Sequence, residues 1–310
     1  MIELSVVVTI YNAEQVLPEL IERLQKAAQS VSGDYELIFI EDRGRDQSWK
    51  VLKALAQQDD RIKAARLARN FGQHNAITAG LYVAQGNYVV LMDGDLQDEP
   101  EVIPQLYREI KETKKEIIYV RRVRRKDSAF KKTTAKFFYK GFSILSGMEV
   151  NPEVGTFRIM TRLVRESFCE FREVDKYIGG IFYWMSFEDG YFEAEHRERK
   201  HGKSNYNLSR MLKLALNGML SFSNKPLNIA MYIGFISAIG SMIMGLYFLS
   251  IKLLYNVKIE GYYSIIVSLF FIGGLILFVL GIIGQYIGRI YDQVRSRPEF
   301  LVQEKINFKP

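Results

Sequence analysis

The sequence predicts an α/β protein: a doubly wound, Rossmann-like domain followed by a C-terminal hairpin of two transmembrane helices. Three observations predict this fold class. Short runs rich in Val and Ile alternate with helical periods between residues 4 and 120. Acidic and amide side chains follow the ends of several of these runs. Two stretches without a charged residue, 226–251 and 261–288, lie in the last third of the chain.

The apolar runs in the first part of the chain have the length and composition of buried parallel strands. They lie at 4–10, 37–40, 62–67, 88–92 and 117–120. Helical periods separate them at 16–24, 51–56, 76–84 and 100–110, and Pro100 opens the last of these. Because parallel strands joined by helices connect by right-handed crossovers, this order predicts a doubly wound sheet.

Composition excludes several classes of protein. The chain has 310 residues, enough for a large buried core, and a formal net charge of +7. Its single cysteine excludes a disulfide framework and a zinc site built on cysteines. The three histidines, His74, His196 and His201, do not have the spacing of metal ligands.

Polar residues at the predicted strand ends mark a binding site, because open α/β sheets bind ligands at the carboxyl ends of their strands. They are Tyr11 and Asn12 after the first strand, Asp42 after the second, and Asp93, Asp95 and Gln97 after the fourth. The first strand is followed by neither a glycine-rich phosphate loop nor a Walker lysine. A metal ion is therefore the expected means of holding a phosphate.

Asp93 and Asp95 form an Asp-Gly-Asp motif directly after an apolar run. Gly94 would let the chain turn so that both carboxylates reach one hard cation, Mg²⁺ or Mn²⁺. Solvated loop acids are the alternative interpretation of such a motif, and its position at a strand end favours the metal site.

The two uncharged stretches are each longer than the roughly 20 residues that cross a hydrocarbon core about 30 Å thick. A pair of buried helices in a soluble core is the alternative. Cations flank the hairpin, so the positive-inside rule predicts that both flanks, and the first 225 residues with them, are cytoplasmic. The flanking cations are Lys213, Lys225, Arg289, Arg295, Arg297, Lys305 and Lys309.

A basic stretch at 121–147 carries interleaved aromatic residues, among them Phe130, Phe137 and Phe142. This pattern is typical of a helix on an anionic membrane surface. Nucleic-acid binding and a merely solvated face are the alternatives. Because the hairpin already ties the domain to a bilayer, anionic membrane lipid is the expected partner of this stretch, and nucleic acid is not. The residues expected at the lipid surface are Arg124, Arg125, Lys131, Lys132, Lys136 and Lys140. A second such helix is expected within 205–225, with a core-packing helix as the alternative.

Four segments, VVVTIYNAE, FIEDRGRDQS, ARNFGQHNAITAGL and VVLMDGDLQDEPEVIP, resemble the family 2 glycosyltransferases with a GT-A fold. More narrowly, they resemble the polyprenyl-phosphate glycosyltransferases, which include dolichol-phosphate mannose synthases and bactoprenol-phosphate glucosyltransferases. The segment RERKHGKSNYN and the hairpin extend the resemblance over nearly the whole chain. The expected domains are a cytoplasmic GT-A catalytic domain at 1–204, a juxtamembrane helix at 205–225, transmembrane helices at 226–251 and 261–288, and a cytoplasmic basic tail at 289–310.

The resemblance implies roles for single residues. Asp42 would hold the uracil or ribose, and Tyr11 and Asn12 would form the base-side wall. Asp93 and Asp95 would bind the metal, with Gln97 as a further ligand. Arg199, Lys203 and Ser204 would meet phosphates. The sequence departs from the family pattern at two places. In the second motif, Arg43-Gly44 replaces Gly-Ser. Thr156 stands where many bactoprenol enzymes have an Asp that is proposed to assist catalysis.

The expected activity is the inverting transfer of one sugar, with UDP-glucose as the favoured donor, to undecaprenyl phosphate at the cytoplasmic leaflet of the inner membrane. A lipid phosphate is largely dianionic at neutral pH, because its second pKa is about 6, so a general base is not obligatory. Cations must instead hold two anions together, and Arg121 and Arg122 are candidates beside Asp95, Arg199 and Lys203. A GDP-mannose-dependent synthase and a non-catalytic membrane scaffold are the alternatives. The sequence is compatible with both a monomer and a homo-oligomer.

Overall fold

The structure is a computed structural model that describes residues 1–122, 143, 154–174, 176–194, 223–255 and 261–308. The chain divides into two compact units. The first comprises Met1–Lys140, Met148–Leu208 and Arg297–Pro310, and the second comprises Gly141–Gly147 and Ser209–Ser296.

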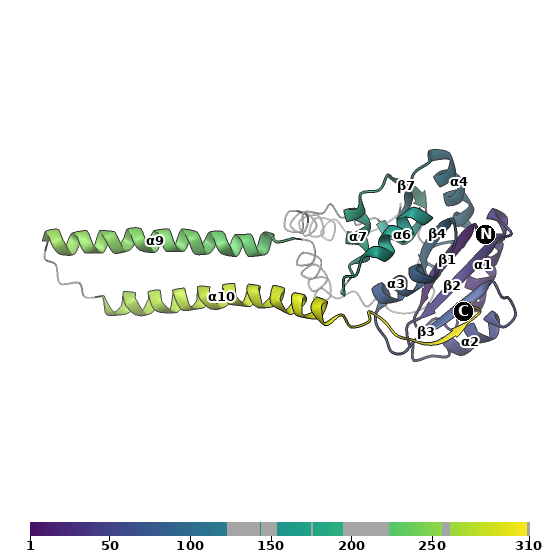
Figure 1. The fold of residues 1–310 in the computed structure, drawn as a ribbon, viewed down its shortest axis with the longest axis horizontal. Helices are drawn as coiled ribbons and strands as arrows, with labels where there is room; N and C mark the ends of the chain where they lie inside the picture. Colours follow the sequence, from purple (N-terminus) through teal and green to yellow (C-terminus); the bar gives the residue numbers. More distant parts are fainter. Residues whose placement is uncertain (123–142, 144–153, 175, 195–222, 256–260, 309–310) are drawn as a thin grey trace. The chain divides into compact units, whose positions relative to one another are not determined.

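The first unit is built on one eight-stranded mixed sheet with the strand order β7-β5-β6-β4-β1-β2-β3-β8 (Figure 1). The strands expected from the apolar runs are confirmed, and β4, β1, β2 and β3 are parallel neighbours. Their bounds are β1 Leu4–Ile10, β2 Tyr35–Glu41, β3 Ile62–Leu67, β4 Tyr88–Asp93 and β5 Ile117–Arg122. The predicted α/β fold class is thereby confirmed.

Helices cover both faces of this sheet. On one face, α1 (Leu17–Val31), α2 (Ser48–Ala56) and α4 (Ile103–Thr113), preceded by the short 3₁₀ helix η1 (Pro100–Val102), pack a continuous apolar core. The opposite face carries α3 (Gln73–Val83), α6 (Arg162–Glu170) and α7 (Ile178–Met185). Helix α3 lies so close to β1 that a Cβ on Gly80 would be 2.3 Å from Val7 Cγ1, so only glycine fits there.

The sheet also contains three strands that the βα repeat did not predict. Strand β6 (Val154–Thr161) runs antiparallel between β4 and β5, and β7 (Asp189–Ala194) extends the edge parallel to β5. At the other edge, β8 (Val302–Ile306) pairs antiparallel with β3. In the expected basic tail at 289–310, residues 289–295 therefore continue α10 and Val302–Ile306 form β8.

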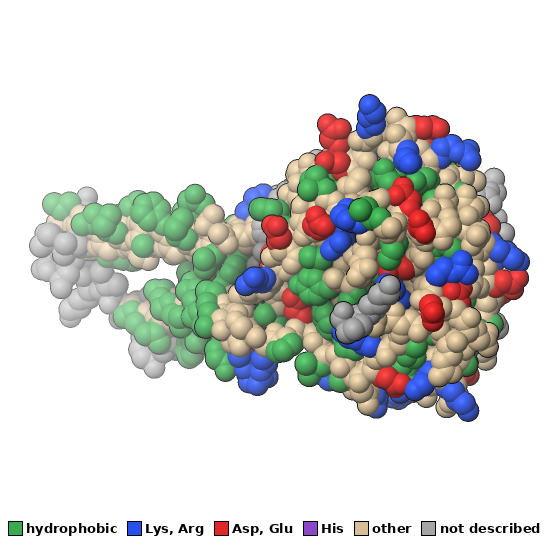
Figure 2. All heavy atoms as spheres, turned by 45° about the vertical axis from the view of Figure 1, so that its right-hand side comes forward, with side chains coloured by type: hydrophobic (Ala, Val, Ile, Leu, Met, Phe, Trp, Pro, Cys, Tyr) green, Lys and Arg blue, Asp and Glu red, His purple; other side chains and the backbone are tan. Residues whose placement is uncertain are grey.

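The second unit contains two long helices, α9 (Lys225–Tyr255) and α10 (Tyr262–Arg295), which lie side by side (Figure 1). Each includes a stretch, Lys225–Phe248 and Val267–Arg295, that is long and apolar enough to cross a membrane. Figure 2 shows hydrophobic side chains covering both helices. Small residues of α9, such as Gly234 and Ala238, share a groove with Leu275 of α10. The pair could form the predicted transmembrane hairpin, and it indicates membrane association.

Several sequence predictions concern residues outside those that the structure describes. They include most of the basic segment 121–147 and most of the juxtamembrane segment 205–225. The single residues concerned are Arg124, Arg125, Lys131, Lys132, Lys136, Lys140, Arg199, Lys203 and Ser204.

Candidate active site

The polar residues that follow the parallel strands meet at one edge of the sheet. Strand β1 lies between β2 and β4, with Ile10 opposite Glu41 and Thr9 opposite Asp93. Tyr11 and Asn12 therefore follow β1 at a point flanked by the ends of β2 and β4. The order of the strands switches here: β2 and β3 lie on one side of β1, and β4 lies on the other. Open α/β sheets bind their ligands at such switch points. The predicted grouping of the strand ends is present.

Asn12 holds the loop that follows β2. Its side-chain Oδ1 accepts a hydrogen bond from the Arg45 backbone N–H at 2.7 Å. A Cβ on Gly44 would lie 2.9 Å from the same oxygen, so glycine allows this close approach. Asn12 and Arg43 both have φ 53°, in the left-handed region. Tyr11 beside them is 52% exposed, which leaves its ring accessible at the edge of the site.

Asp42 is buried and binds the loop that opens α3. Its two carboxylate oxygens accept hydrogen bonds from the backbone N–H groups of Phe71 and Gly72, at 2.7 and 2.9 Å. Burial raises the pKa of Asp42, and these two hydrogen bonds oppose that effect. The structure therefore gives Asp42 a direct role in shaping the edge, and a ribose or base would have to share oxygens that already accept from the backbone.

Half-buried and buried residues alternate through the Asp-Gly-Asp motif and the two residues after it. Asp93, Asp95 and Gln97 are half-buried, whereas the residues between them are buried. Gly94 packs under β1, where a Cβ would lie 2.5 Å from Ile10 Cδ1. Asp93, Asp95 and Gln97 are thus all partly accessible to a ligand.

Further contacts hold the two carboxylates. Asp93 Oδ1 accepts a hydrogen bond from Gln73 Nε2 at 2.7 Å, and Asp95 Oδ1 accepts one from the Gln97 backbone N–H at 3.1 Å. Gln73 is the first residue of α3, so the loop held by Asp42 also positions the partner of Asp93.

The donor set fits a hard divalent cation. Two carboxylates and one amide oxygen are ligands that Mg²⁺ and Mn²⁺ prefer, and such ions take their remaining ligands from water and substrate phosphate. Within the described part of the chain, no group of three His, Cys, Asp or Glu side chains is arranged to hold a metal. A cation at Asp93, Asp95 and Gln97 would therefore take its remaining ligands from water and from a phosphate-bearing ligand.

A buried arginine beside Asp93 escaped the sequence analysis. Arg158 in β6 is 5% exposed, and its guanidinium donates to the backbone carbonyls of Thr156 and Gly155, both at 2.9 Å. It lies 5.0 Å from the ring centroid of Tyr119 and 4.7 Å from that of Phe182. The only sequence signal is a single Arg inside the apolar run of GTFRIM.

Electrostatics link Arg158 to the metal ligands and to His74. Burial lowers the pKa of Arg158, and the nearby charge of Asp93 is among the effects that oppose this. Burial, followed by the charge of Arg158, lowers the pKa of His74, which keeps its imidazole neutral. His74 Nδ1 has no hydrogen-bond partner among the described residues. A neutral imidazole and a buried cation thus flank the Asp93 side of the site.

Arg121 and Arg122 end β5 at the same edge of the sheet. The Arg121 guanidinium lies 4.7 Å from the ring centroid of Tyr191, whose ring is stacked on Tyr119. Burial raises the pKa of Tyr119 to about 12, so its hydroxyl stays protonated. Only the backbone of Arg122 is described. Arg121 thus lies near the aromatic rings that also contact Arg158.

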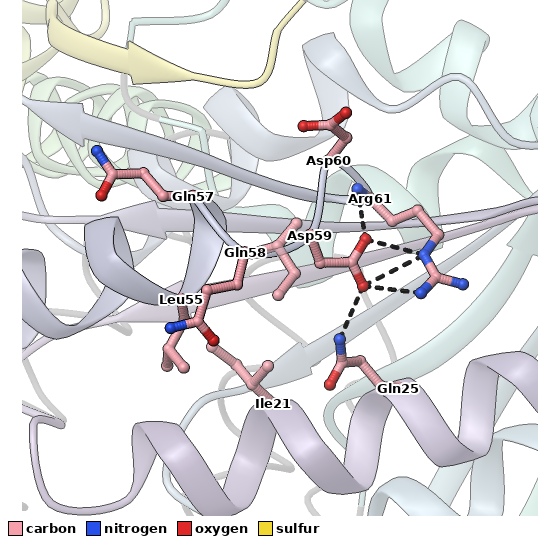
Figure 3. Close-up of a pocket in the computed structure, with 9 residues that line it drawn as sticks. Ile21, Gln25, Leu55, Gln57, Gln58, Asp59, Asp60 and Arg61 are labelled. Carbon is pink, nitrogen blue, oxygen red and sulfur yellow. Dashed lines mark hydrogen bonds and ion pairs between the residues drawn. The ribbon is translucent and has the colours of Figure 1, made fainter.

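A further hollow in the first unit lies elsewhere. It has a volume of about 790 Å³ and is lined by α1, α2 and the turn before β3 (Figure 3). Its polar groups bind one another: Asp59 accepts hydrogen bonds from Arg61 and from Gln25, and the bonding to Arg61 lowers the pKa of Asp59. This hollow adjoins the start of β3, away from the carboxyl ends, and holds none of the candidate site residues.

Comparisons with solved structures agree with the fold. Mannosyl-3-phosphoglycerate synthase from Rubrobacter xylanophilus matches with a TM-score of 0.50 at 15% identity, over 70% of this chain and 72% of that one. Glucosyl-3-phosphoglycerate synthase from Mycobacterium tuberculosis matches with a TM-score of 0.51 at 15% identity, over 72% of this chain and 80% of that one. At this identity the likeness concerns the fold alone.

Sequence comparisons cover nearly the whole chain. An uncharacterised glycosyltransferase of Bacillus subtilis is 37% identical over 98% of this chain and 94% of its own. The SfII prophage-derived bactoprenol glucosyl transferase of Shigella flexneri is 33% identical over 99% of this chain and 100% of its own. Residues 5–170, which contain all but the first residue of β1, the whole of β2 to β6 and the Asp-Gly-Asp motif, match the Glycosyl transferase family 2. The chain therefore belongs to glycosyltransferase family 2.

Proposed function

We propose that the protein transfers a single sugar from a nucleotide-sugar to a polyprenyl phosphate, with UDP-glucose as donor and undecaprenyl phosphate as acceptor. The observation that supports this most is the half-buried set Asp93, Asp95 and Gln97 beside the nucleotide-side residues of β1 and β2. Two apolar helices on the same chain suit an acceptor that is confined to a bilayer. Full-length relatives named bactoprenol glucosyl transferase support the lipid and the sugar.

The reaction forms a bond between a phosphate oxygen of the lipid and the anomeric carbon, and it breaks the bond from that carbon to the diphosphate. The lipid phosphate attacks from the face opposite the leaving UDP, so the configuration inverts. A dianionic nucleophile carries no proton that must be removed, so Thr156 in place of an Asp is compatible with turnover. A bound Mg²⁺ or Mn²⁺ would stabilise negative charge on the departing diphosphate.

The chain's own residues supply position and charge. Gln73 holds Asp93, and Asp42 holds the loop from which Gln73 extends. Arg121 and Arg122, with Arg199 and Lys203, would compensate the charge of the donor and acceptor phosphates, and Ser204 would assist at the nucleotide-sugar. The neutral His74 and the buried Arg158 would limit the access of water to the Asp93 side of the site.

The choice of donor is tested with the purified full-length protein in detergent or nanodiscs. We expect transfer of labelled glucose from UDP-glucose to undecaprenyl phosphate in the presence of Mn²⁺ or Mg²⁺. Transfer from GDP-mannose and not from UDP-glucose would show that the protein is a GDP-mannose-dependent synthase. If no labelled UDP- or GDP-sugar is transferred or hydrolysed, the chain is a scaffold that kept the fold.

Membrane orientation follows from the charges that flank the hairpin. We propose an inner-membrane protein that crosses twice, with the domain at 1–204 and the segment after residue 288 in the cytoplasm, and with a basic surface at 121–147 on the anionic leaflet. A reporter fused after Pro310 is expected to behave as cytoplasmic, and one inserted near Asn256 as external. Both reporters on one side would mean that α9 and α10 do not cross the bilayer.

A further inference from the structure

The segment that follows α10 is part of the sheet domain. Strand β8 pairs with β3 from Leu67 opposite Val302 to Ala64 opposite Ile306. The Ala68 backbone N–H extends this pairing with a hydrogen bond to the Leu301 carbonyl at 2.8 Å. The segment therefore covers what would otherwise be an open sheet edge.

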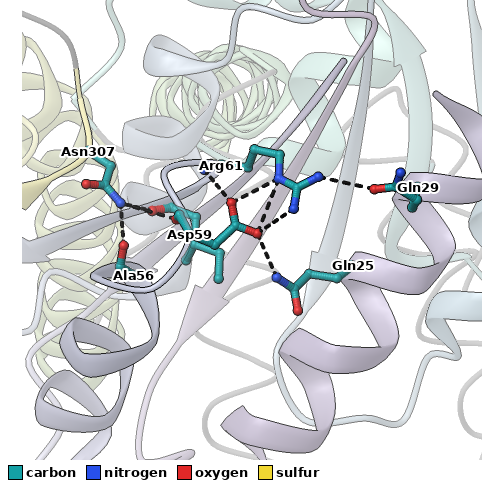
Figure 4. A network of polar contacts seen from close by, with 7 residues as sticks. Gln25, Gln29, Ala56, Asp59, Arg61 and Asn307 are labelled. Atoms are coloured by element: carbon teal, nitrogen blue, oxygen red, sulfur yellow. Dashed lines mark hydrogen bonds and ion pairs between the residues drawn. The ribbon is translucent and has the colours of Figure 1, made fainter. Parts of the chain in front are cut away.

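Side chains hold this segment at both of its ends. Before β8, Glu299 binds the ammonium of Lys176, whose side chain is 0% exposed, at 2.5 Å. After β8, Asn307 Nδ2 donates to the carbonyls of Ala56 and Ile62, at 2.6 and 2.9 Å. Figure 4 shows Asn307 reaching from the C-terminal segment to the end of α2. The position of β8 is thus set by its pairing with β3 and by side-chain contacts at both of its ends.

Two side chains of β8 reach the elements that follow β2. Gln303 Oε1 accepts a hydrogen bond from Arg43 Nη1. Glu304, the next residue, accepts one from Trp49 Nε1 at 3.0 Å. Contacts with Arg43 and Trp49 connect β8 to both the loop 42–46 and the first turn of α2.

Contacts from the sheet hold the same loop on its inner side. Arg66 of β3 donates to Glu41 Oε2 at 2.9 Å, and Glu41 Oε1 accepts from the Gly44 backbone N–H at 2.5 Å. Arg43 lies between Asp42 and Gly44 with φ 53°, a conformation that is unfavourable for a residue with a Cβ. Such a residue stays in place only when the surrounding contacts hold it. Gln303 supplies one of those contacts from the C-terminal strand.

We propose that Gln303 is a positioning residue for donor binding: it holds Arg43, and with it the loop 42–46, against which the nucleotide of the donor lies. The inference rests on the proposed function, because it requires a nucleotide at the ends of β1 and β2. It also gives a physical role to the departure from the family's second motif. Where relatives of this type have Gly-Ser, Arg43 provides a side chain that β8 can hold.

Binding of UDP to the purified full-length protein, measured by calorimetry in the presence of Mn²⁺, tests the proposal. Gln303→Ala is expected to raise the Kd for UDP about fivefold, as loss of one hydrogen bond of ordinary net strength predicts. In turnover, the KM for the donor should rise while kcat and the KM for undecaprenyl phosphate stay as in the wild type. Gln303→Glu keeps an acceptor for Arg43 and should restore the wild-type Kd.

Lys305→Ala is the matched control, because Lys305 is exposed on the same strand two residues away and should leave the Kd unchanged. In an Arg43→Ala background, Gln303→Ala should have no additional effect. An unchanged Kd for Gln303→Ala, or an equal loss in both backgrounds, would overturn the proposal.

A wild-type protein that binds neither UDP nor GDP would instead contradict the proposed function. In that case hydrogen exchange decides the positioning role. Backbone amides of the loop 42–46 should exchange faster in Gln303→Ala than in Lys305→Ala, and equal rates would overturn it.

Discussion

Asp95→Ala is expected to lower turnover with UDP-glucose and undecaprenyl phosphate by on the order of a thousandfold. The substitution removes one of two carboxylates that would hold the divalent cation, and such a cation contributes several kcal/mol of transition-state stabilisation. Asp95 is half-buried and lies in the turn after β4, so the core of the sheet should stay intact. Initial rates measured across a range of Mn²⁺ concentrations, together with the thermal midpoint of each protein, check this.

Asp60→Ala is a suitable control for that experiment. Asp60 is an exposed acid in the hollow beside the start of β3, so its removal changes the net charge equally without touching the carboxyl ends of the strands. Its turnover should match the wild type. Full Mn²⁺-dependent activity of Asp95→Ala would refute the metal assignment.

The first half of the fold could be predicted from local patterns. Strands β1 to β4 are short apolar runs, and the helices between them have a clear apolar period, so burial in the structure follows the sequence closely. The motif Asp93-Gly94-Asp95 was recognisable because both the strand before it and its position in a parallel sheet were predictable. Residues that such patterns place at strand ends were therefore found.

The remaining parts depend on contacts between distant segments. Strand β8 is partly polar, and what keeps it in the sheet is pairing with β3 and contacts such as Trp49 with Glu304, more than 250 residues apart in the chain. Strand β6 contains Thr156 and Arg158, whose polarity resembles that of a loop. The partners that satisfy Arg158, among them Tyr119 and Phe182, come from other elements, so no local period reports its burial.

Replacement of the buried Arg158 is expected to have a large effect on stability. Arg158→Met is expected to lower the free energy of unfolding by about 3 kcal/mol, because each buried carbonyl left without its donor costs roughly 1–3 kcal/mol. The carbonyls of Gly155 and Thr156 lose their donors, and Asp93 loses a neighbouring cation. For a domain of this size, that corresponds to a fall in the thermal midpoint of about 6–12 °C. Thermal unfolding of the purified protein followed by tryptophan fluorescence measures it.

Arg61→Met is the matched control, because it makes the same replacement at an arginine that pairs with Asp59 and whose side chain is 44% exposed. Exposed pairs contribute about 1 kcal/mol or less, so its midpoint should stay close to that of the wild type. Asp93→Asn should recover part of the loss when combined with Arg158→Met, since it removes the carboxylate charge that Arg158 compensates. Equal midpoints for Arg158→Met and Arg61→Met would show that Arg158 is as dispensable as a surface arginine. The charge of Asp93 would then be balanced from the solvent side of the site.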